Sequence, residues 1–137
     1  MTDKLKTFLA QSNIANWLGF SFTEENGALR YALSFDEQHI GNPAIRALHG
    51  GVIAAFLEVA AQCELLNALS ENAAVRTVNL DIDYLASSRA QDMYGRARIT
   101  RLGRRIAFVE AEGWQESKDR PVSRARFRIR IDTDQQA

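Results

Sequence analysis

The chain has 137 residues, of which 46% are hydrophobic and 25% are charged. This length and composition are typical of one globular domain and exclude a disordered or fibrous chain. The 17 Lys and Arg residues are balanced by 17 Asp and Glu residues, which argues against a nucleic-acid partner because such proteins use excess positive charge to bind phosphates.

The first half of the chain is predicted to hold two helices and one strand. Residues 3–18 place apolar side chains at roughly helical spacing and predict a short amphipathic helix. Alternation of apolar and polar side chains over Ala28–Asp36 predicts a half-buried strand, and the turn-rich segment 37–48 predicts a linker. Residues 52–69 predict a helix that is apolar around almost its whole circumference, so it should be enclosed by protein.

The second half is predicted to be a run of four strands. Residues 77–84 alternate strictly, with Val78 and Tyr84 both on the apolar face. The further extended segments are around 93–101, 105–116 and 121–131. Short turns join them, so they should form an antiparallel meander. The whole order predicts an α+β fold, in which an antiparallel sheet wraps around one long central helix.

Cysteine usage and hydropathy predict the setting of the chain. The only cysteine, Cys63, cannot form a disulfide within the chain, which fits a reducing compartment. Polar residues interrupt the N-terminal apolar patch, so we expect no signal peptide. The most apolar stretch ends at Glu58 and is shorter than the roughly 20 residues that cross a bilayer. We therefore expect a single cytoplasmic domain over residues 1–137 with no membrane partner.

The strongest functional pattern is His49-Gly50-Gly51, directly before the long predicted helix. The first N–H groups of a helix have no acceptor within the helix, and the helix dipole is positive there. Two glycines let another molecule approach this backbone, so amide donors could stabilise the oxyanion of an acyl transfer. Glu58, nine residues after His49, is a candidate general base or nucleophile. His49 could be a base, but a role in orienting the backbone is the simpler explanation.

The spacing of His49-Gly50-Gly51, six further residues and Glu58 resembles the HGG-x6-Asp/Glu signature of hot-dog-fold acyl-CoA thioesterases of the phenylacetate-pathway (PaaI-like) group. The resemblance includes the segments GNPAIRAL, RTVNLDIDYLASSR and RITRLGRRIA. It implies a hot-dog fold, in which a Gly50 or Gly51 amide polarises the thioester carbonyl. It also implies a homodimer or homotetramer, in which Glu58 of the other subunit attacks the carbonyl carbon or activates water.

The same resemblance points to further candidate residues. The family commonly has Asn or Gln six residues before the histidine, where this chain has Pro43 with Asn42 beside it. Asn42 is therefore a candidate for positioning water. Gln62, one turn beyond Glu58, stands where some relatives carry a hydroxyl group and is a candidate hydrogen-bonding residue.

Arginine and serine side chains near two predicted turns are candidates for binding the phosphates of CoA. Arginine pairs well with phosphate, although a solvated turn explains these residues equally well. The candidates are Arg104, Arg105, Ser87, Ser88 and Arg89. Arginines at alternate positions from Arg124 to Arg130 predict a solvated sheet face instead.

Other catalytic plans fit the sequence less well. A zinc site would have to rely on carboxylates, because the chain has two histidines and one cysteine. The motifs GxSxG, GxxxxGK[ST] and GxGxxG do not occur, which excludes typical serine α/β-hydrolases, P-loop proteins and Rossmann enzymes. We expect neither a metal nor a cofactor.

These patterns predict a thioesterase that hydrolyses an acyl-CoA or aryl-CoA to the free acid and CoA. A noncatalytic acyl-CoA-binding module with the same groove is one alternative, although such a sensor would not need Glu58. An enoyl-CoA hydratase on the same fold is the other, although neither histidine has the spacing of that signature.

Overall fold

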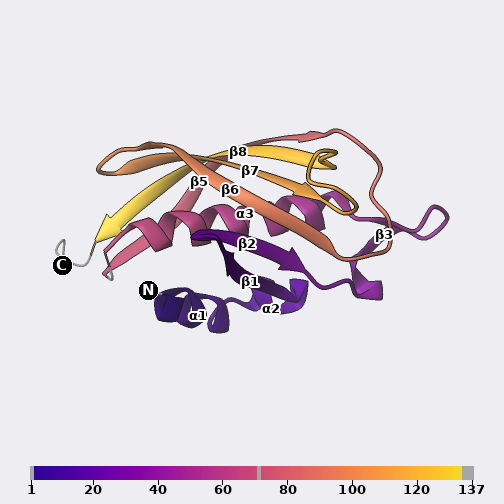
Figure 1. Ribbon diagram of the computed structural model, residues 1–137, viewed down its shortest axis with the longest axis horizontal. Coiled ribbons are helices and arrows are strands. Elements are labelled where there is room, and N and C mark those ends of the chain that lie inside the picture. Colours follow the sequence, from indigo (N-terminus) through magenta and orange to yellow (C-terminus); the bar gives the residue numbers. More distant parts are fainter. Residues whose placement is uncertain (1, 71, 134–137) are drawn as a thin grey trace.

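The computed structural model describes residues 2–70 and 72–133, and within them a six-stranded antiparallel sheet curves around one long helix (Figure 1). The strands are β1 (Phe20–Glu25), β2 (Ala28–Leu33), β5 (Ala73–Tyr84), β6 (Met93–Leu102), β7 (Ile106–Trp114) and β8 (Ser123–Thr133). They lie in the order β1-β2-β6-β7-β8-β5. The predicted sheet around a central helix is confirmed, and β1 is an addition that the sequence pattern did not predict.

The central helix is α3 (Gly50–Ala68), which lies against the concave face of the sheet (Figure 1). Gly95 on β6 and Gly113 on β7 are directly opposite each other beneath it. A Cβ at Gly95 would lie 3.0 Å from the Phe56 ring, and one at Gly113 would lie 3.4 Å from Leu57. The two glycines therefore make room for the large side chains of α3 against the sheet.

The predicted helix over residues 3–18 is two helices, α1 (Thr2–Ala10) and α2 (Asn13–Leu18). The break occurs at Ser12, whose Oγ accepts a hydrogen bond from the Ala15 N–H at 3.1 Å. Ser12 is therefore an N-cap that starts a new helix. Both helices cover the side of α3 that faces away from the sheet (Figure 1).

The predicted linker contains a 3₁₀ turn, η1 (Glu37–His39), and a short ribbon of β3 (Ile40–Asn42) and β4 (Ala47–Leu48). His39 is 1% exposed, and its Nε2 donates a hydrogen bond to the Trp17 carbonyl at 3.0 Å. A buried imidazole needs such partners because an unpaired polar group in the interior is costly. This contact holds the linker against α2.

The long helix starts earlier than predicted, so Gly50 and Gly51 form its first turn instead of preceding it. By length and composition α3 is apolar enough to cross a membrane, contrary to the expectation from its interruption at Glu58. Its apolar side chains have partners within the fold, because the sheet lies on one side and α1 and α2 on the other. A central helix enclosed in this way is expected to be apolar all round.

Strand β5 is an edge strand over its whole length, and its apolar face is less covered than the alternation predicted. A bulge lies between Thr77 and Asn79, and Val78 at this bulge is 54% exposed. Leu80 and Tyr84 are 38% and 52% exposed. Long apolar edges attract other strands, so proteins normally cover or interrupt them.

Candidate functional site

His49 closes the N-terminus of α3 and satisfies three of its first four N–H groups. Its Nδ1 accepts a hydrogen bond from the Gly51 N–H at 2.8 Å, and its carbonyl accepts from Val52 at 2.9 Å and Ile53 at 3.2 Å. Because Nδ1 is an acceptor, the proton of the neutral ring lies on Nε2. The structure therefore places His49 as the cap that orients the first turn.

The remaining first-turn amide belongs to Gly50. Its N–H has no acceptor within residues 2–70 and 72–133, whereas the Gly51 N–H is bound by His49. The helix dipole adds positive potential at this end. Of the two glycines, Gly50 is the one whose amide is free to donate to an oxyanion.

Two residues that the sequence patterns did not single out support this turn. Tyr84 donates a hydrogen bond from Oη to the Gly50 carbonyl at 2.8 Å. Gly41 lies directly against His49, because a Cβ at Gly41 would be 2.8 Å from the His49 Cα. Sequence showed Tyr84 only as a strand residue and Gly41 only as a turn residue, since both contacts join positions well separated along the chain.

Glu58 lies half-buried on the side of α3 that faces β5. Gly51, Ala55, Glu58 and Gln62 are spaced by four, three and four residues, so they share one side of the helix. The Gln62 Nε2 donates to the Thr77 Oγ1 on β5 at 3.2 Å, which shows that this side of α3 faces β5. The Glu58 carboxylate makes no hydrogen bond or ion pair with the described part of the chain.

The two ends of this candidate site lie about two helical turns apart within one chain. Gly50 and Glu58 are eight residues apart on α3, which corresponds to roughly 12 Å along the helix axis. A carbonyl bond is about 1.2 Å long, and a hydrogen bond spans about 3 Å. One hydrogen-bonded carbonyl therefore spans only part of the distance between the two backbone positions.

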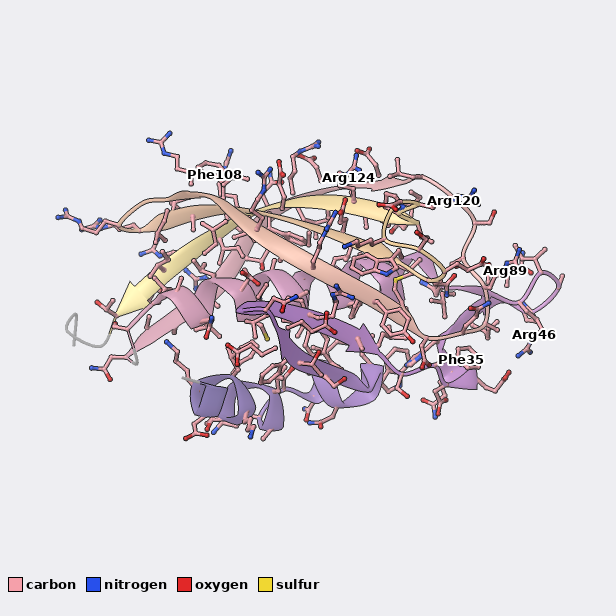
Figure 2. The ribbon with its side chains drawn as sticks, viewed as in Figure 1. Phe35, Arg46, Arg89, Phe108, Arg120 and Arg124 are labelled. Atoms are coloured by element: carbon pink, nitrogen blue, oxygen red, sulfur yellow. The ribbon has the colours of Figure 1, made fainter. Side chains whose placement is uncertain are left out.

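Two other candidates have side-chain oxygens that accept hydrogen bonds from backbone N–H groups. Asn42 accepts from the Ala44 N–H at 3.0 Å through Oδ1 and stabilises the turn between β3 and β4. Ser88 is buried and accepts from the Leu48 N–H at 3.0 Å through Oγ. Its neighbour Arg89 is exposed and lies at the end of the molecule that carries the β3–β4 ribbon (Figure 2). Ser87 is also exposed.

The structure does not bring the two groups of CoA-binding candidates together in one chain. The Arg105 carbonyl accepts from the Ile131 N–H, near the end of β8. At the other end, the Leu85 N–H donates to the Val122 carbonyl just before β8 begins. Val122 and Ile131 are nine positions apart, which corresponds to about 30 Å of extended chain. Arg104 and Arg105 thus lie at the opposite end of the sheet from the segment that follows Tyr84.

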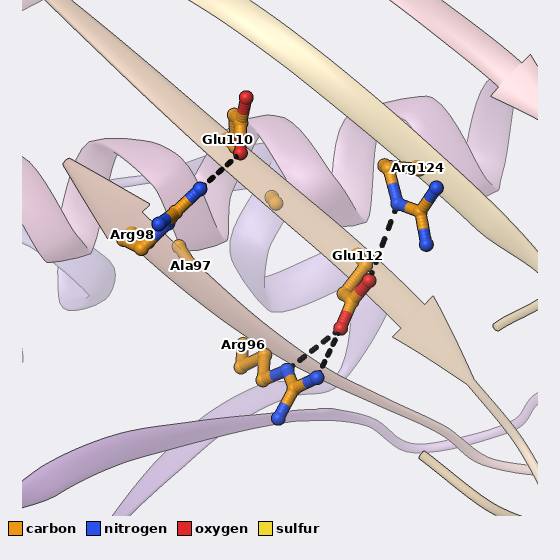
Figure 3. Close-up of a pocket in the computed structure, with 7 residues that line it drawn as sticks. Arg96, Ala97, Arg98, Glu110, Glu112 and Arg124 are labelled. Atoms are coloured by element: carbon orange, nitrogen blue, oxygen red, sulfur yellow. Dashed lines mark hydrogen bonds and ion pairs between the residues drawn. The ribbon is translucent and has the colours of Figure 1, made fainter. Parts of the chain in front are cut away.

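A hollow of about 500 Å³ lies on the outer face of the sheet, away from α3 (Figure 3). Arg96 and Arg124 both contact Glu112 there, and Arg98 pairs with Glu110 at 2.9 Å. These charges compensate one another across neighbouring strands, so the hollow is a solvated, ion-paired surface. The alternating arginines from Arg124 to Arg130 are exposed, as predicted.

The side of α3 that faces β2 carries a second acid with a defined partner. Tyr31 donates from Oη to the Glu64 Oε1 at 2.6 Å. Burial raises the pKa of Glu64, although this hydrogen bond opposes the shift. Burial also raises the pKa of the adjacent Cys63 to about 12, so this thiol is protonated at neutral pH.

A comparison with protein-family models gives one match, described as the thioesterase superfamily, over residues 46–122. This range includes the first turn of α3, Glu58 and the strands as far as β7. No curated protein sequence matches the chain.

Solved structures show the same fold at low sequence identity. A phenylacetic acid degradation-related protein from Ralstonia eutropha is 24% identical, with a TM-score of 0.80 over 93% of this chain and 98% of that chain. A thioesterase from Haemophilus influenzae is 19% identical, with a TM-score of 0.82 over 97% and 91% of the two chains. A protein from Bacillus halodurans, solved with CoA, is 18% identical, with a TM-score of 0.81 over 97% and 89%. The predicted hot-dog fold is thereby confirmed.

Proposed function

Because the chain belongs to the thioesterase superfamily, we propose that it hydrolyses an acyl-CoA or aryl-CoA to the free acid and CoA. Family membership supports thioester hydrolysis, and the CoA bound to the Bacillus halodurans neighbour supports a CoA ester as the substrate. The spacing from His49 to Glu58 favours the phenylacetate-pathway group. One observation carries the proposal: the Gly50 N–H and the Glu58 carboxylate, neither of which has a partner among the described residues, lie on one helix beside an open sheet edge.

The reaction follows from these two groups. The thioester oxygen accepts a hydrogen bond from the Gly50 N–H, which stabilises the oxyanion as negative charge develops. Glu58 of the other subunit either takes a proton from water, whose oxygen adds to the carbonyl carbon, or adds its own oxygen there. In both routes the carbon–sulfur bond breaks, and the CoA thiolate leaves and is protonated. In the second route, water then hydrolyses the resulting anhydride.

The exposed edge of β5 supports a homodimer formed by antiparallel pairing of two β5 strands. Leu80, Tyr84 and Leu85 are 38%, 52% and 49% exposed in the single chain, and a second copy would cover them. The side of α3 that carries Glu58 faces the same edge. Pairing there would bring two antiparallel α3 helices together, each with its Glu58 towards the Gly50 end of the other.

Charge along β5 supports the same pairing. Arg76 lies near one end of the outer face of β5, and Asp81 and Asp83 lie near the other. None of the three forms an ion pair in the described chain. Antiparallel pairing about the middle of β5 would place the Arg76 of each strand near the aspartates of its partner, which is the self-complementarity that a twofold interface requires.

The proposed dimer would also bring the two groups of CoA-binding candidates together, one group from each subunit. Within one chain Arg104 and Arg105 lie about 30 Å from the segment after Tyr84. An antiparallel partner reverses this order, so the partner subunit's Arg104 and Arg105 would lie at the end that carries Ser87 and Arg89. We therefore propose that both subunits contribute groups that bind the CoA phosphates.

The first experiment measures thiol release from short, medium, long and aromatic acyl-CoAs by the wild-type protein, with its mass in solution measured in parallel. We expect hydrolysis of at least one class and the mass of a dimer or tetramer. Tight binding of acyl-CoA without thiol release would contradict hydrolysis and favour the noncatalytic binding module. Full activity in a monomer would contradict the shared site.

A further inference from the structure

We propose that Ile14 and Trp17 of α2 form the wall of an acyl-binding subsite and determine which acyl groups are accepted. The inference rests on the proposed function and assigns the part of the site that recognises the acid half of the substrate. Neither residue belongs to the sequence patterns that point to catalysis.

The subsite is a hollow of about 340 Å³ between α2 and the first turns of α3. Ile14 and Trp17 line it from α2, and Val52 and Ala55 line it from α3. Ile14 is 46% exposed and Trp17 is 42% exposed. Exposed apolar side chains gathered around one hollow mark a ligand-binding or interaction surface more often than scattered ones do.

The Trp17 ring is held in place although much of it is exposed. Its Nε1 donates to the Gln38 Oε1 at 2.8 Å, and its ring meets the buried His39 ring edge-on, with centroids 4.8 Å apart. The same His39 donates a hydrogen bond to the Trp17 carbonyl. A fixed ring presents apolar surface without losing side-chain freedom when a ligand binds, so this wall is preorganised.

The hollow adjoins the catalytic groups of the proposed reaction. Gly51 and His49 line it, so it begins beside the amide of Gly50. Gly51 and Ala55 also belong to the side of α3 that carries Glu58. An acyl group whose carbonyl oxygen accepts from the Gly50 N–H can therefore extend along α3 towards Ile14 and Trp17.

The chemistry of the lining selects uncharged, apolar acyl groups. In the described chain the lining contains no Lys, Arg, Asp or Glu side chain. An acyl group with a terminal carboxylate would lose its hydration there without gaining an ion pair, which is costly. Straight-chain or aromatic groups would instead bury apolar surface against Trp17 and Ile14.

The test compares kcat/KM for acetyl-, hexanoyl-, decanoyl-, benzoyl- and succinyl-CoA in Ile14→Phe, Ile14→Ala and Trp17→Ala. Ile14→Phe fills the hollow and should lower kcat/KM for decanoyl-CoA by about tenfold or more relative to acetyl-CoA, the scale of one or more methylene contacts. Trp17→Ala should lower kcat/KM for hexanoyl-CoA and benzoyl-CoA relative to kcat/KM for acetyl-CoA. Wild type should prefer hexanoyl-CoA to succinyl-CoA.

A matched control uses Leu102→Phe and Leu102→Ala, since Leu102 is 50% exposed at the end of β6 that joins β7, away from α2 of the same chain (Figure 1). These changes should leave the ratios between substrates unaltered. If the Ile14 and Trp17 variants change all substrates by one common factor, or change none, the subsite assignment is wrong.

Binding separates failure of this inference from failure of the proposed function. Nonhydrolysable thioether analogues of the same acyl-CoAs, titrated by calorimetry, report the subsite without requiring turnover. An absence of thiol release from every substrate would overturn the proposed function. The subsite would still be supported if Ile14→Phe selectively weakened the decanoyl analogue, and contradicted if it did not.

Discussion

Two glutamates on α3 lie six residues apart, which places them about 120° apart around the helix, and they differ in their partners. Glu64 faces β2, where the Tyr31 hydroxyl donates a hydrogen bond to it at 2.6 Å. Glu58 faces β5 and the open edge of the sheet, and its carboxylate has no partner in the described chain. Both are half-buried, so burial alone does not distinguish them.

The difference indicates which acid is structural and which is available for chemistry. A partly buried carboxylate that lacks a hydrogen bond costs stability, and Tyr31 offsets that cost for Glu64. For Glu58 nothing within the described chain does so, whereas water, substrate and a second subunit can reach it from the open edge. A carboxylate that is accessible and has no structural partner is available to act on a substrate.

The largest effect is expected when the same substitution, Glu to Gln, is made at both positions and the two variants are compared. Glu58→Gln removes the only group proposed to activate water or attack the carbonyl, so kcat should fall by about 100- to 10,000-fold. Glu64→Gln keeps an acceptor for Tyr31 and should leave kcat within about threefold of wild type. Thiol release measures both. Equal losses in the two variants would contradict the assignment of Glu58, provided that circular dichroism shows both to be folded.

Gly50→Pro should have the next largest effect, because it removes the free amide without removing a helix hydrogen bond. Proline is favoured at the first position of a helix, and His49 already has φ −63° and ψ 136°, which suit a residue before proline. Loss of one oxyanion donor typically lowers kcat by about 100- to 1000-fold. Gly50→Ala is the control, since it adds a Cβ near Tyr84 but keeps the N–H.

Mixing these two variants tests whether the site is shared between subunits. Refolding Glu58→Gln together with Gly50→Pro produces mixed dimers in which one of the two sites has both an intact Gly50 amide and an intact Glu58. Activity should therefore return in the mixture to well above that of either variant alone. A mixture that is no more active than its components would show that both groups act within one chain.

Much of the fold was predictable because it depends on local periodicity. The alternation over β2 correctly placed Leu29, Tyr31 and Leu33 in the core, and the apolar circumference of α3 correctly indicated an enclosed helix. The break at Ser12 was missed because apolar spacing continues across it. Strand β1 was missed because its alternation covers only the four residues Phe20–Thr23 before two exposed glutamates follow.

The candidate site was predictable to the extent that it lies in one stretch of sequence. His49, Gly50 and Glu58 are close in the chain and have a recognisable spacing. The choice of Gly50 over Gly51 was not predictable, because it depends on the direction of the His49 Nδ1. The support from Tyr84 comes from the end of β5, and no spacing rule connects it to Gly50.

A smaller expected effect is the contribution of Glu64 to the free energy of unfolding, which should depend on pH. The pKa of Glu64 is raised above its ordinary value of 4.5 by burial, so the folded state binds this proton more tightly than the unfolded state. This contribution to stability is fully present below pH 4.5 and is lost as the pH rises through the folded pKa. Relative to Glu64→Gln, the free energy of unfolding of wild type should therefore fall as the pH rises above about 4.5.

Urea unfolding of the two proteins at a series of pH values measures this difference. A difference that stays constant with pH, or that grows in favour of wild type as the pH rises, would contradict it.

Tyr31→Phe removes the hydrogen-bond donor to Glu64 and should lower the free energy of unfolding by about 1–2 kcal/mol at neutral pH, with thiol release per folded molecule unchanged.

The smallest expected effect is at Gln62, which shares the open side of α3 with Glu58. Its Nε2 is bound to the Thr77 Oγ1 at 3.2 Å, so the amide is held against β5 instead of being free for substrate. Gln62→Ala should therefore lower kcat by no more than about threefold, and Thr77→Val, which removes the same contact from the other side, should match it. If Gln62→Ala lost about tenfold or more while Thr77→Val did not, Gln62 would contact the substrate, and the reactive part of this side would extend one turn beyond Glu58.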